Sequence, residues 1–150
     1  MTSAIPRILG EVYCAPREVI GVAGPVFFIS HFAVKEGKLD ELKGLFEELT
    51  TELIRSKPNT LAYLSYLDDT GSRLTILHGF SDANAMDAHF EGADERSAAA
   101  YEFIEPRGWE IYGQASEGAL AGMRREAEAA GVSLTVLTDY VGGFHRLQPA

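Results

Sequence analysis

His78 is the side chain whose surroundings in the sequence most favour acid–base chemistry. It lies in the run RLTILHGF, which has the composition of a β-strand. It alternates there with Leu74, Ile76 and Phe80, so all four side chains share one face of that strand. Apolar surroundings shift an imidazole pKa readily, so His78 could act as a base towards a phenol or an enol. The alternative is a core histidine that is hydrogen-bonded to a neighbouring backbone or hydroxyl group.

Aromatic side chains form a second group of candidates. Together they could wall a flat apolar pocket suited to an aromatic ligand. Helical and strand periodicity alone explains most of them equally well as plain core. The group consists of Phe28, Phe32, Phe80, Phe90, Tyr101, Phe103 and Trp109.

The elements that must position these residues follow from hydrophobic periodicity and turn signals. In the first strand Phe28, Ser30 and Phe32 share one face and His31 lies on the other, and both faces are apolar, as in a strand covered on both sides. In this interpretation Pro106 and Gly108 end the third helix. The predicted order is strand 26–34, helix 39–55, strand 61–67, strand 73–80, helix 83–90, helix 94–104, strand 109–114, helix 117–130 and strand 132–141.

Length, charge and cysteine content narrow the class of protein. A chain of 150 residues is about one domain, and its hydrophobic content of 46% is ordinary for a globular protein. A net charge of −9 argues against nucleic-acid and anionic-membrane partners. The apolar run 19–34 falls short of the ~20 residues that span a membrane. The single cysteine, Cys14, excludes an internal disulfide and favours a reducing compartment, so we expect a cytoplasmic protein.

Several chemical signatures are absent from the sequence. Neither G-x-G-x-x-G nor G-x-x-x-x-G-K-[ST] occurs, which removes support for a nucleotide-binding fold. No H-x-x-x-H or Cys/His cluster indicates a metal site, and no G-x-S-x-G nucleophile elbow is present. We therefore expect neither a metal nor a cofactor.

Four segments in order resemble a known family. A strand ending in F-x-V-x-x-G-K (Phe32–Lys38) precedes a leucine-rich helix, and a hairpin with a central Tyr63 follows. The next strand runs into S-D-x-x-A-M-x-A-H (Ser81–His89). Over roughly Pro25–Ser116 this pattern resembles the antibiotic-biosynthesis monooxygenase family of dimeric α+β barrels. The resemblance implies an α+β, ferredoxin-like fold in which an antiparallel sheet carries helices on one face.

The resemblance also implies a domain organisation and a partner. Residues 1–24 would be an extended N-terminal arm, and residues 25–150 one ferredoxin-like domain. Within that domain, 25–116 is the family core and 117–150 adds a C-terminal helix and strand. The family pairs two sheets face to face, so we expect a homodimer through the sheet face. His31 would then pack or form a hydrogen bond between subunits.

In the family a pocket lies between the sheet and its helices, which implies roles for particular residues. Ser30 falls where haem-degrading members carry an asparagine, and Phe80 falls where a tryptophan is common. His89 matches a helix histidine of the family, but it comes too early to ligate haem as those members do. These departures argue against the alternative of a haem-binding or haem-degrading protein.

We therefore predict a cofactor-independent monooxygenase acting on a small aromatic, quinol-like or polyketide-like substrate. His78 would be the base or hydrogen-bond partner and Ser30 an orienting hydroxyl. The expected substrate-binding residues are Phe28, Phe32, Phe80, His89, Tyr101 and Trp109. Two alternatives remain open: a non-catalytic dimeric protein that binds a small aromatic ligand, and a structural member whose own side chains fill the pocket.

Overall fold

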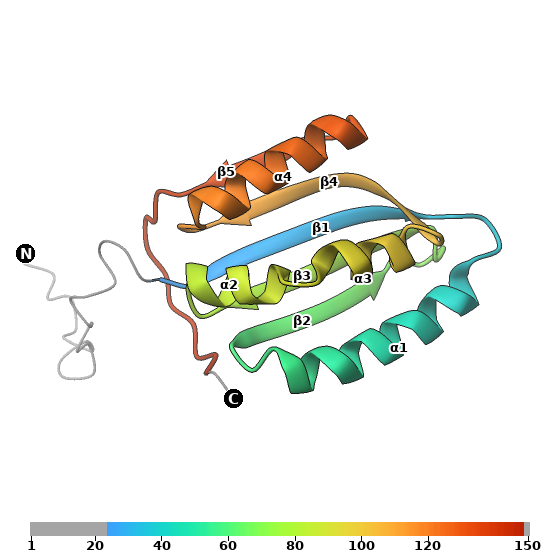
Figure 1. Ribbon diagram of the computed structural model, residues 1–150, viewed down its shortest axis with the longest axis horizontal. Helices are drawn as coiled ribbons and strands as arrows, with labels where there is room; N and C mark the ends of the chain where they lie inside the picture. The colour runs from blue at the N-terminus through green and yellow to red at the C-terminus, as the bar shows by residue number, and fades with distance from the viewer. Residues whose placement is uncertain (1–23, 149–150) are drawn as a thin grey trace, which may run out of the picture.

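The structure, a computed structural model, describes residues 24–148 of the chain. Within that range five strands form one sheet and four helices pack on it (Figure 1). The predicted arm, residues 1–24, lies outside the described residues apart from Gly24. The elements are β1 (Val26–Val34), α1 (Leu39–Ser56), β2 (Thr60–Leu67), β3 (Arg73–Phe80), α2 (Ala83–Phe90), α3 (Ala93–Ala100), β4 (Ile104–Tyr112), α4 (Glu117–Ala130) and β5 (Leu134–Leu137).

The strand order of the sheet is β2-β3-β1-β4-β5. Strand β1 lies at the centre and pairs antiparallel with β3 and β4, while β2 pairs antiparallel with β3. This βαββαβ arrangement of β1 to β4 confirms the ferredoxin-like α+β fold. The predicted C-terminal addition is also present, because β5 extends the sheet by pairing in parallel with β4 and α4 connects the two.

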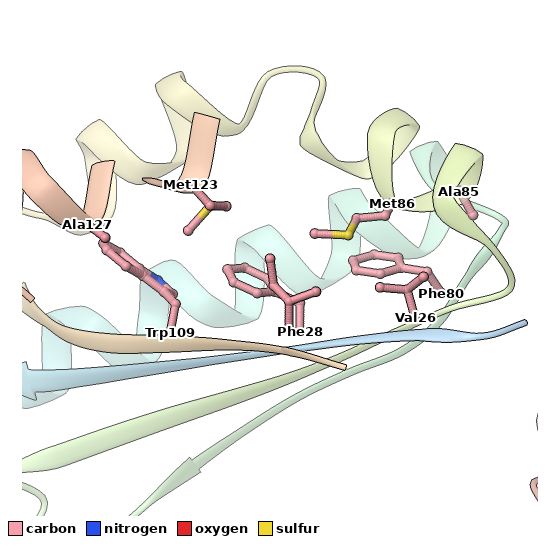
Figure 2. Close-up of a cluster of buried hydrophobic side chains, with 9 residues drawn as sticks. Val26, Phe28, Phe80, Ala85, Met86, Trp109, Met123 and Ala127 are labelled. Carbon is pink, nitrogen blue, oxygen red and sulfur yellow. The ribbon is translucent and has the colours of Figure 1, made fainter. Parts of the chain in front are cut away.

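All four helices lie on the same face of the sheet, as Figures 1 and 2 agree. Helix α1 is amphipathic and turns Leu42 and Leu53 inward. The carboxylate of Asp82 caps α2 by accepting the Ala85 amide at 2.8 Å. The Ser116 hydroxyl caps α4 by accepting the Ala119 amide at 3.1 Å.

Side chains from the sheet and from the helices form two buried clusters between the two layers. The first lies beneath α2 and α4 and contains Phe28, Trp109 and Met123 (Figure 2). The second lies beneath α1 and α3 and contains Phe32 and Ile76. Strand alternation produces this burial, because every second residue of β1 and β3 points towards the helices.

None of the helices within residues 24–148 covers the opposite face of the sheet, which is called the open face below. Leu64 and Tyr66 on β2 are 47% and 56% exposed. In the middle of this face His31 Nε2 lies 2.6 Å from Glu110, and Tyr112 donates to the same carboxylate at 2.7 Å. The predicted division of β1, with Phe28, Ser30 and Phe32 on one face and His31 on the other, is therefore confirmed.

The sequence prediction is wrong between residues 94 and 114. Helix α3 ends at Ala100, and Pro106 and Gly108 lie inside β4. A register shift accommodates them, since His31 pairs with Gly108 and Phe32 with Pro106, which leaves Arg107 as a bulge. Proline lacks the amide that a regular ladder needs but is tolerated at a bulge, and Gly108 adopts φ 153°.

The last predicted strand is also too long. It was expected over residues 132–141, whereas β5 covers only Leu134–Leu137. The described chain beyond it is largely exposed. None of the described helices combines the length and the apolar character needed to cross a membrane.

Candidate functional site

A cavity of about 120 Å³ lies between the sheet and the helices, where the two core clusters meet. Two rows of paired residues form its floor. In one row His78 of β3 lies beside Phe28 of β1, and in the other Ser30 of β1 lies beside Trp109 of β4. Helices α1, α2, α3 and α4 supply the other walls. This cavity argues against the alternative of a structural protein whose own side chains fill the pocket.

Seven of the eight site residues expected from the sequence line this cavity. They are Phe28, Ser30, Phe32, His78, His89, Tyr101 and Trp109. Phe80 does not line it, because its side chain is completely buried in the first cluster. Its ring lies 5.1 Å from that of His89 and 6.1 Å from that of His78, so it packs against both imidazoles.

His78 is held in one tautomer by the backbone. Its Nδ1 lies 3.0 Å from the carbonyl oxygen of Phe28, which can only accept, so Nδ1 carries the proton. The other ring nitrogen, Nε2, is then an acceptor and forms no hydrogen bond with any residue of 24–148. Burial lowers the pKa of His78 to about 4, outweighing the bond to Phe28, and nearby Arg96 lowers it further. His78 is thus neutral at pH 7. It bonds to the backbone, as a core histidine would, and it also lines the cavity, while its role as a base stays a prediction.

His89 of α2 forms a pair with His78 across the cavity wall. The two rings meet edge to face with centroids 5.3 Å apart. His89 Nδ1 lies 2.9 Å from the Thr60 hydroxyl. Burial lowers the pKa of His89 to about 3, and His78 in its protonated form, Arg96 and Lys57 act in the same direction. The site therefore holds two neutral imidazoles side by side.

Arg96 of α3 is the principal residue that the sequence analysis missed. It lines the cavity and donates to the carbonyl oxygens of His89 and, at 3.0 Å, Glu91 at the end of α2. No carboxylate of the described residues lies within ion-pair distance of it. Its charge therefore faces the cavity without a counter-ion. The only signal in the sequence was a lone basic residue in the alanine-rich stretch ADERSAAA.

Tyr63 of β2 is a second missed residue. It is paired with His78 in the sheet, and the two rings meet edge-on at 5.1 Å. Burial raises the pKa of Tyr63 to about 12, so its hydroxyl stays protonated. Burial and then the charge of Glu126 likewise raise the pKa of Tyr101. Both phenols are therefore neutral hydrogen-bonding groups in the cavity.

The C-terminal addition contributes to the cavity as well. Met123 and Glu126 of α4 both line it. Burial raises the pKa of Glu126, and the negative charge of Asp94 on α3 adds to the shift. The family pattern recognised in the sequence ends before α4, so it gave no reason to expect these two residues.

The arrangement favours an anion bound among apolar walls. One cation (Arg96), one carboxyl group (Glu126), two neutral imidazoles and two neutral phenols face a space that is otherwise mainly apolar. A cation in low-dielectric surroundings stabilises a nearby negative charge far more than it would in water. Among residues 24–148, no three His, Cys, Asp or Glu side chains gather closely enough to hold a metal ion.

Comparison with known proteins places this geometry in a family. The model of the antibiotic biosynthesis monooxygenase family matches residues 25–101, which is about half of the chain. The chain belongs to this family. Its members include cofactor-independent oxygenases, and they commonly dimerise. No curated protein matches the sequence significantly.

Solved structures agree on the fold. MupZ from Pseudomonas fluorescens is similar with a TM-score of 0.62 and 15% identity, over 82% of this chain and 92% of that one. A match over 82% of this chain is longer than residues 25–116, so the structural similarity extends beyond the family core. A mutant form of SnoaB, a cofactor-independent oxygenase from Streptomyces nogalater, is similar with a TM-score of 0.53 and 14% identity. The match covers 63% of this chain and 96% of that one. A conserved protein from Methanosarcina mazei is similar with a TM-score of 0.53 and 21% identity, over 60% of this chain and 92% of that one.

Proposed function

We propose that this family member is a cofactor-independent oxygenase of a small acidic aromatic substrate, quinol-like or polyketide-like. One observation carries the proposal. The bare Nε2 of neutral His78 and the unpaired charge of Arg96 face the same largely apolar cavity. These are the groups needed to remove a proton from a phenol or enol and to stabilise the resulting anion.

The proposed reaction needs only the substrate and oxygen. His78 Nε2 takes a proton from the substrate, whose anion gives one electron to O₂ to form a substrate radical and superoxide. The two recombine at a ring carbon to form a peroxide, which takes up a proton. Loss of water then converts a CH₂ group and O₂ into a carbonyl group and H₂O, so atoms and electrons balance. Ser30 would orient the substrate oxygen.

The pKa of His78 restricts the substrate. Transfer from an ordinary phenol of pKa about 10 to an imidazole of pKa about 4 would cost about 8 kcal/mol. The imidazolium–phenolate pair that forms would return about 4 kcal/mol at 4 Å and an effective dielectric constant near 20. Arg96 adds to this return. The balance favours substrates more acidic than simple phenols, such as enols conjugated with a carbonyl group.

The cavity volume restricts the substrate further. About 120 Å³ is close to the roughly 150 Å³ of an engineered apolar cavity that accepts benzene. One aromatic ring therefore fits inside. A larger substrate would extend into the adjoining groove of about 590 Å³ between α2–α3 and α4. The reacting ring would lie in the cavity and the remainder of the molecule in the groove.

Oxygen uptake by the purified protein tests the proposal. A panel of hydroquinones and anthrones of graded acidity is offered, and consumption is measured against the uncatalysed rate. The proposal predicts consumption that rises with substrate acidity and that falls at least tenfold in His78→Gln. A rate in His78→Gln equal to that of the wild type would contradict the role of His78.

The weak basicity of His78 favours one other function. A neutral imidazole that only accepts a hydrogen bond suits a non-catalytic protein that binds an acidic aromatic ligand. Trp109 is the only tryptophan of the chain and lines the cavity, so its fluorescence reports binding. Fluorescence quenching by panel members without any oxygen uptake would favour this second function.

We also propose that the open face of the sheet pairs with a second copy of the chain. Support comes from the exposed Leu64 and Tyr66 and from the family's tendency to dimerise. The His31–Glu110 pair would then lie within the interface, where a fixed hydrogen bond selects the register of the two sheets. The cavity lies on the other side of the sheet and would stay open.

A further inference from the structure

The cavity opens into the groove beside it. Four residues line both spaces: Phe90 of α2, Ala93 of α3, and Met123 and Glu126 of α4. These four residues, here called the mouth, lie where the cavity and the groove adjoin. At one end of the groove the Ser116 hydroxyl donates to Asp87 at 2.7 Å and ties the start of α4 to α2.

The mouth and the interior carry opposite charges. The carboxylates that line the groove belong to Asp87, Glu91, Asp94 and Glu126, against the single guanidinium of Arg125. Lys57 lies at the end of α2, where its ammonium group donates to the carbonyls of Ala88 and Glu91. Two charged residues line the cavity: Glu126, which also lines the groove, and the cation Arg96, which does not.

Asp94 of α3 and Glu126 of α4 both line the groove, and Glu126 also belongs to the mouth. Burial raises the pKa of Glu126, and the negative charge of Asp94 adds to this shift. An anion in the groove meets this negative potential before it reaches Arg96. A neutral molecule of the same shape does not.

We propose that the acidic mouth admits the substrate in its neutral, protonated form and that ionisation takes place inside, between His78 and Arg96. The inference rests on the proposal that the cavity is the ligand site, but it does not require turnover. In this proposal Glu126, a residue of the C-terminal addition, helps to determine whether the neutral or the ionised form of the substrate enters the cavity. The mouth thereby selects weak acids over permanent anions.

Two probes of nearly equal shape test the inference. 4-Nitrophenol ionises near neutral pH and its anion absorbs visible light, whereas 4-nitroanisole has no ionisable proton. Stopped-flow quenching of Trp109 gives their association rates between pH 6 and pH 9. We expect the association rate of 4-nitrophenol to fall in step with its neutral fraction and that of 4-nitroanisole to stay constant. The absorbance of bound 4-nitrophenol should show the anion at a pH at which the free probe is mostly neutral.

Charge reversal at the mouth has a matched control. Glu126→Lys should raise the association rate of the 4-nitrophenol anion on the order of tenfold. Glu128→Lys makes the same change of net charge on the same helix, at an exposed residue that lines neither space, and should have little effect. Narrowing the mouth with Ala93→Phe should slow both probes, whereas Ala99→Phe on the exposed side of α3 should not.

The outcomes separate the inference from the proposed oxygenase. Entry of the anion as fast as the neutral form in the wild type, or equal effects of the two lysine variants, would overturn the inference even if oxygen uptake is observed. Selective entry of the neutral probe without oxygen uptake would uphold it and count against the oxygenase. Binding of neither probe would overturn it, because the ligand site would be lost.

Discussion

The two neutral histidines link the site to the stability of the protein. His78 and His89 are buried with pKa values of about 4 and 3, whereas in the unfolded chain they titrate near 6.5. Between these pKa values the unfolded state binds more protons than the folded state. Stability from this source is therefore complete above pH 6.5 and is lost as the pH falls towards 4.

We predict that acidification from pH 7 to pH 4 removes about 3 kcal/mol of unfolding free energy through His78 alone. Urea unfolding of the wild type and of His78→Gln over this range measures the effect as the difference between their slopes. His145→Gln in the exposed C-terminal segment is the control and should keep the wild-type slope. Identical slopes for the wild type and His78→Gln would count against a buried neutral imidazole.

A second prediction concerns the positive charge of Arg96 and its effect on the affinity for an anionic ligand. Arg96→Gln keeps a donor near the carbonyls of α2 but removes the cation from the cavity. Affinity for the 4-nitrophenol anion should fall at least tenfold, since hydrogen bonds to charged groups contribute about 1.5–3 kcal/mol. Affinity for 4-nitroanisole should stay within about twofold. Arg124→Gln on the exposed side of α4 is the control, and equal loss for both probes would indicate a general disruption.

At the scale of elements, a glycine after a strand and a glycine inside a helix have different roles. Gly113 follows β4 with φ 101°, and a Cβ added there would lie 2.7 Å from the backbone oxygen of Pro25. Gly44 lies inside α1, exposed, with nothing within 4 Å of an added Cβ. The first glycine is required by backbone conformation and space, and the second is not.

The two glycines therefore predict opposite effects of alanine. Gly113→Ala should lower the unfolding free energy by about 2 kcal/mol, because strained backbone and close contact both oppose the methyl group. Gly44→Ala should raise it by roughly 0.5–1 kcal/mol through helix propensity. Thermal or urea unfolding measures both. Destabilisation by Gly44→Ala would mean that α1 packs differently at this position.

The sequence predicted the elements well where periodicity and turn signals agreed, as in the strand and helix of 26–55. It failed at β4, because Pro106 and Gly108 read locally as breakers. Only the pairing with β1 determines that they lie at a bulge, and that pairing joins residues about 75 positions apart. Local signals contain no information on such a register.

The candidate site, like the helices and strands, could be predicted from the sequence only in part. Strand alternation brought His78, Ser30 and the aromatic residues to one face, and that face carries the cavity. Phe80 shares the face but lies in the packed core, because α2 covers it. Arg96 and Glu126 could not be predicted, since the placement of α3 and α4 over the sheet decides which polar side chain turns inward.

At the scale of the whole molecule, the two faces of the sheet differ. Its helix face holds the cavity, and its open face presents Leu64, Tyr66 and the His31–Glu110 pair. The hydrogen bond from His31 holds the pKa of Glu110 below its usual range. Because the faces are distinct, assembly and ligand binding should be separable by mutation.

We predict that Leu64→Glu combined with Tyr66→Glu converts a dimer into a monomer, because the charges of two subunits would meet within the interface. Light scattering after size-exclusion chromatography gives the mass. Ile54→Glu is the control, since this residue is 73% exposed on α1 and lies away from the open face. A dimer that survives the double substitution would place the interface elsewhere.

The most direct test compares two histidines on opposite faces of β1 and β3. Oxygen consumption with an acidic hydroquinone or anthrone that the wild type oxidises is measured for His78→Gln and His31→Gln, with binding followed by Trp109 fluorescence. The account predicts that His78→Gln binds substrate but loses at least nine-tenths of the rate, while His31→Gln keeps the wild-type rate. Equal rates in the two variants, or loss confined to His31→Gln, would contradict the assignment of the helix-side cavity as the reaction site.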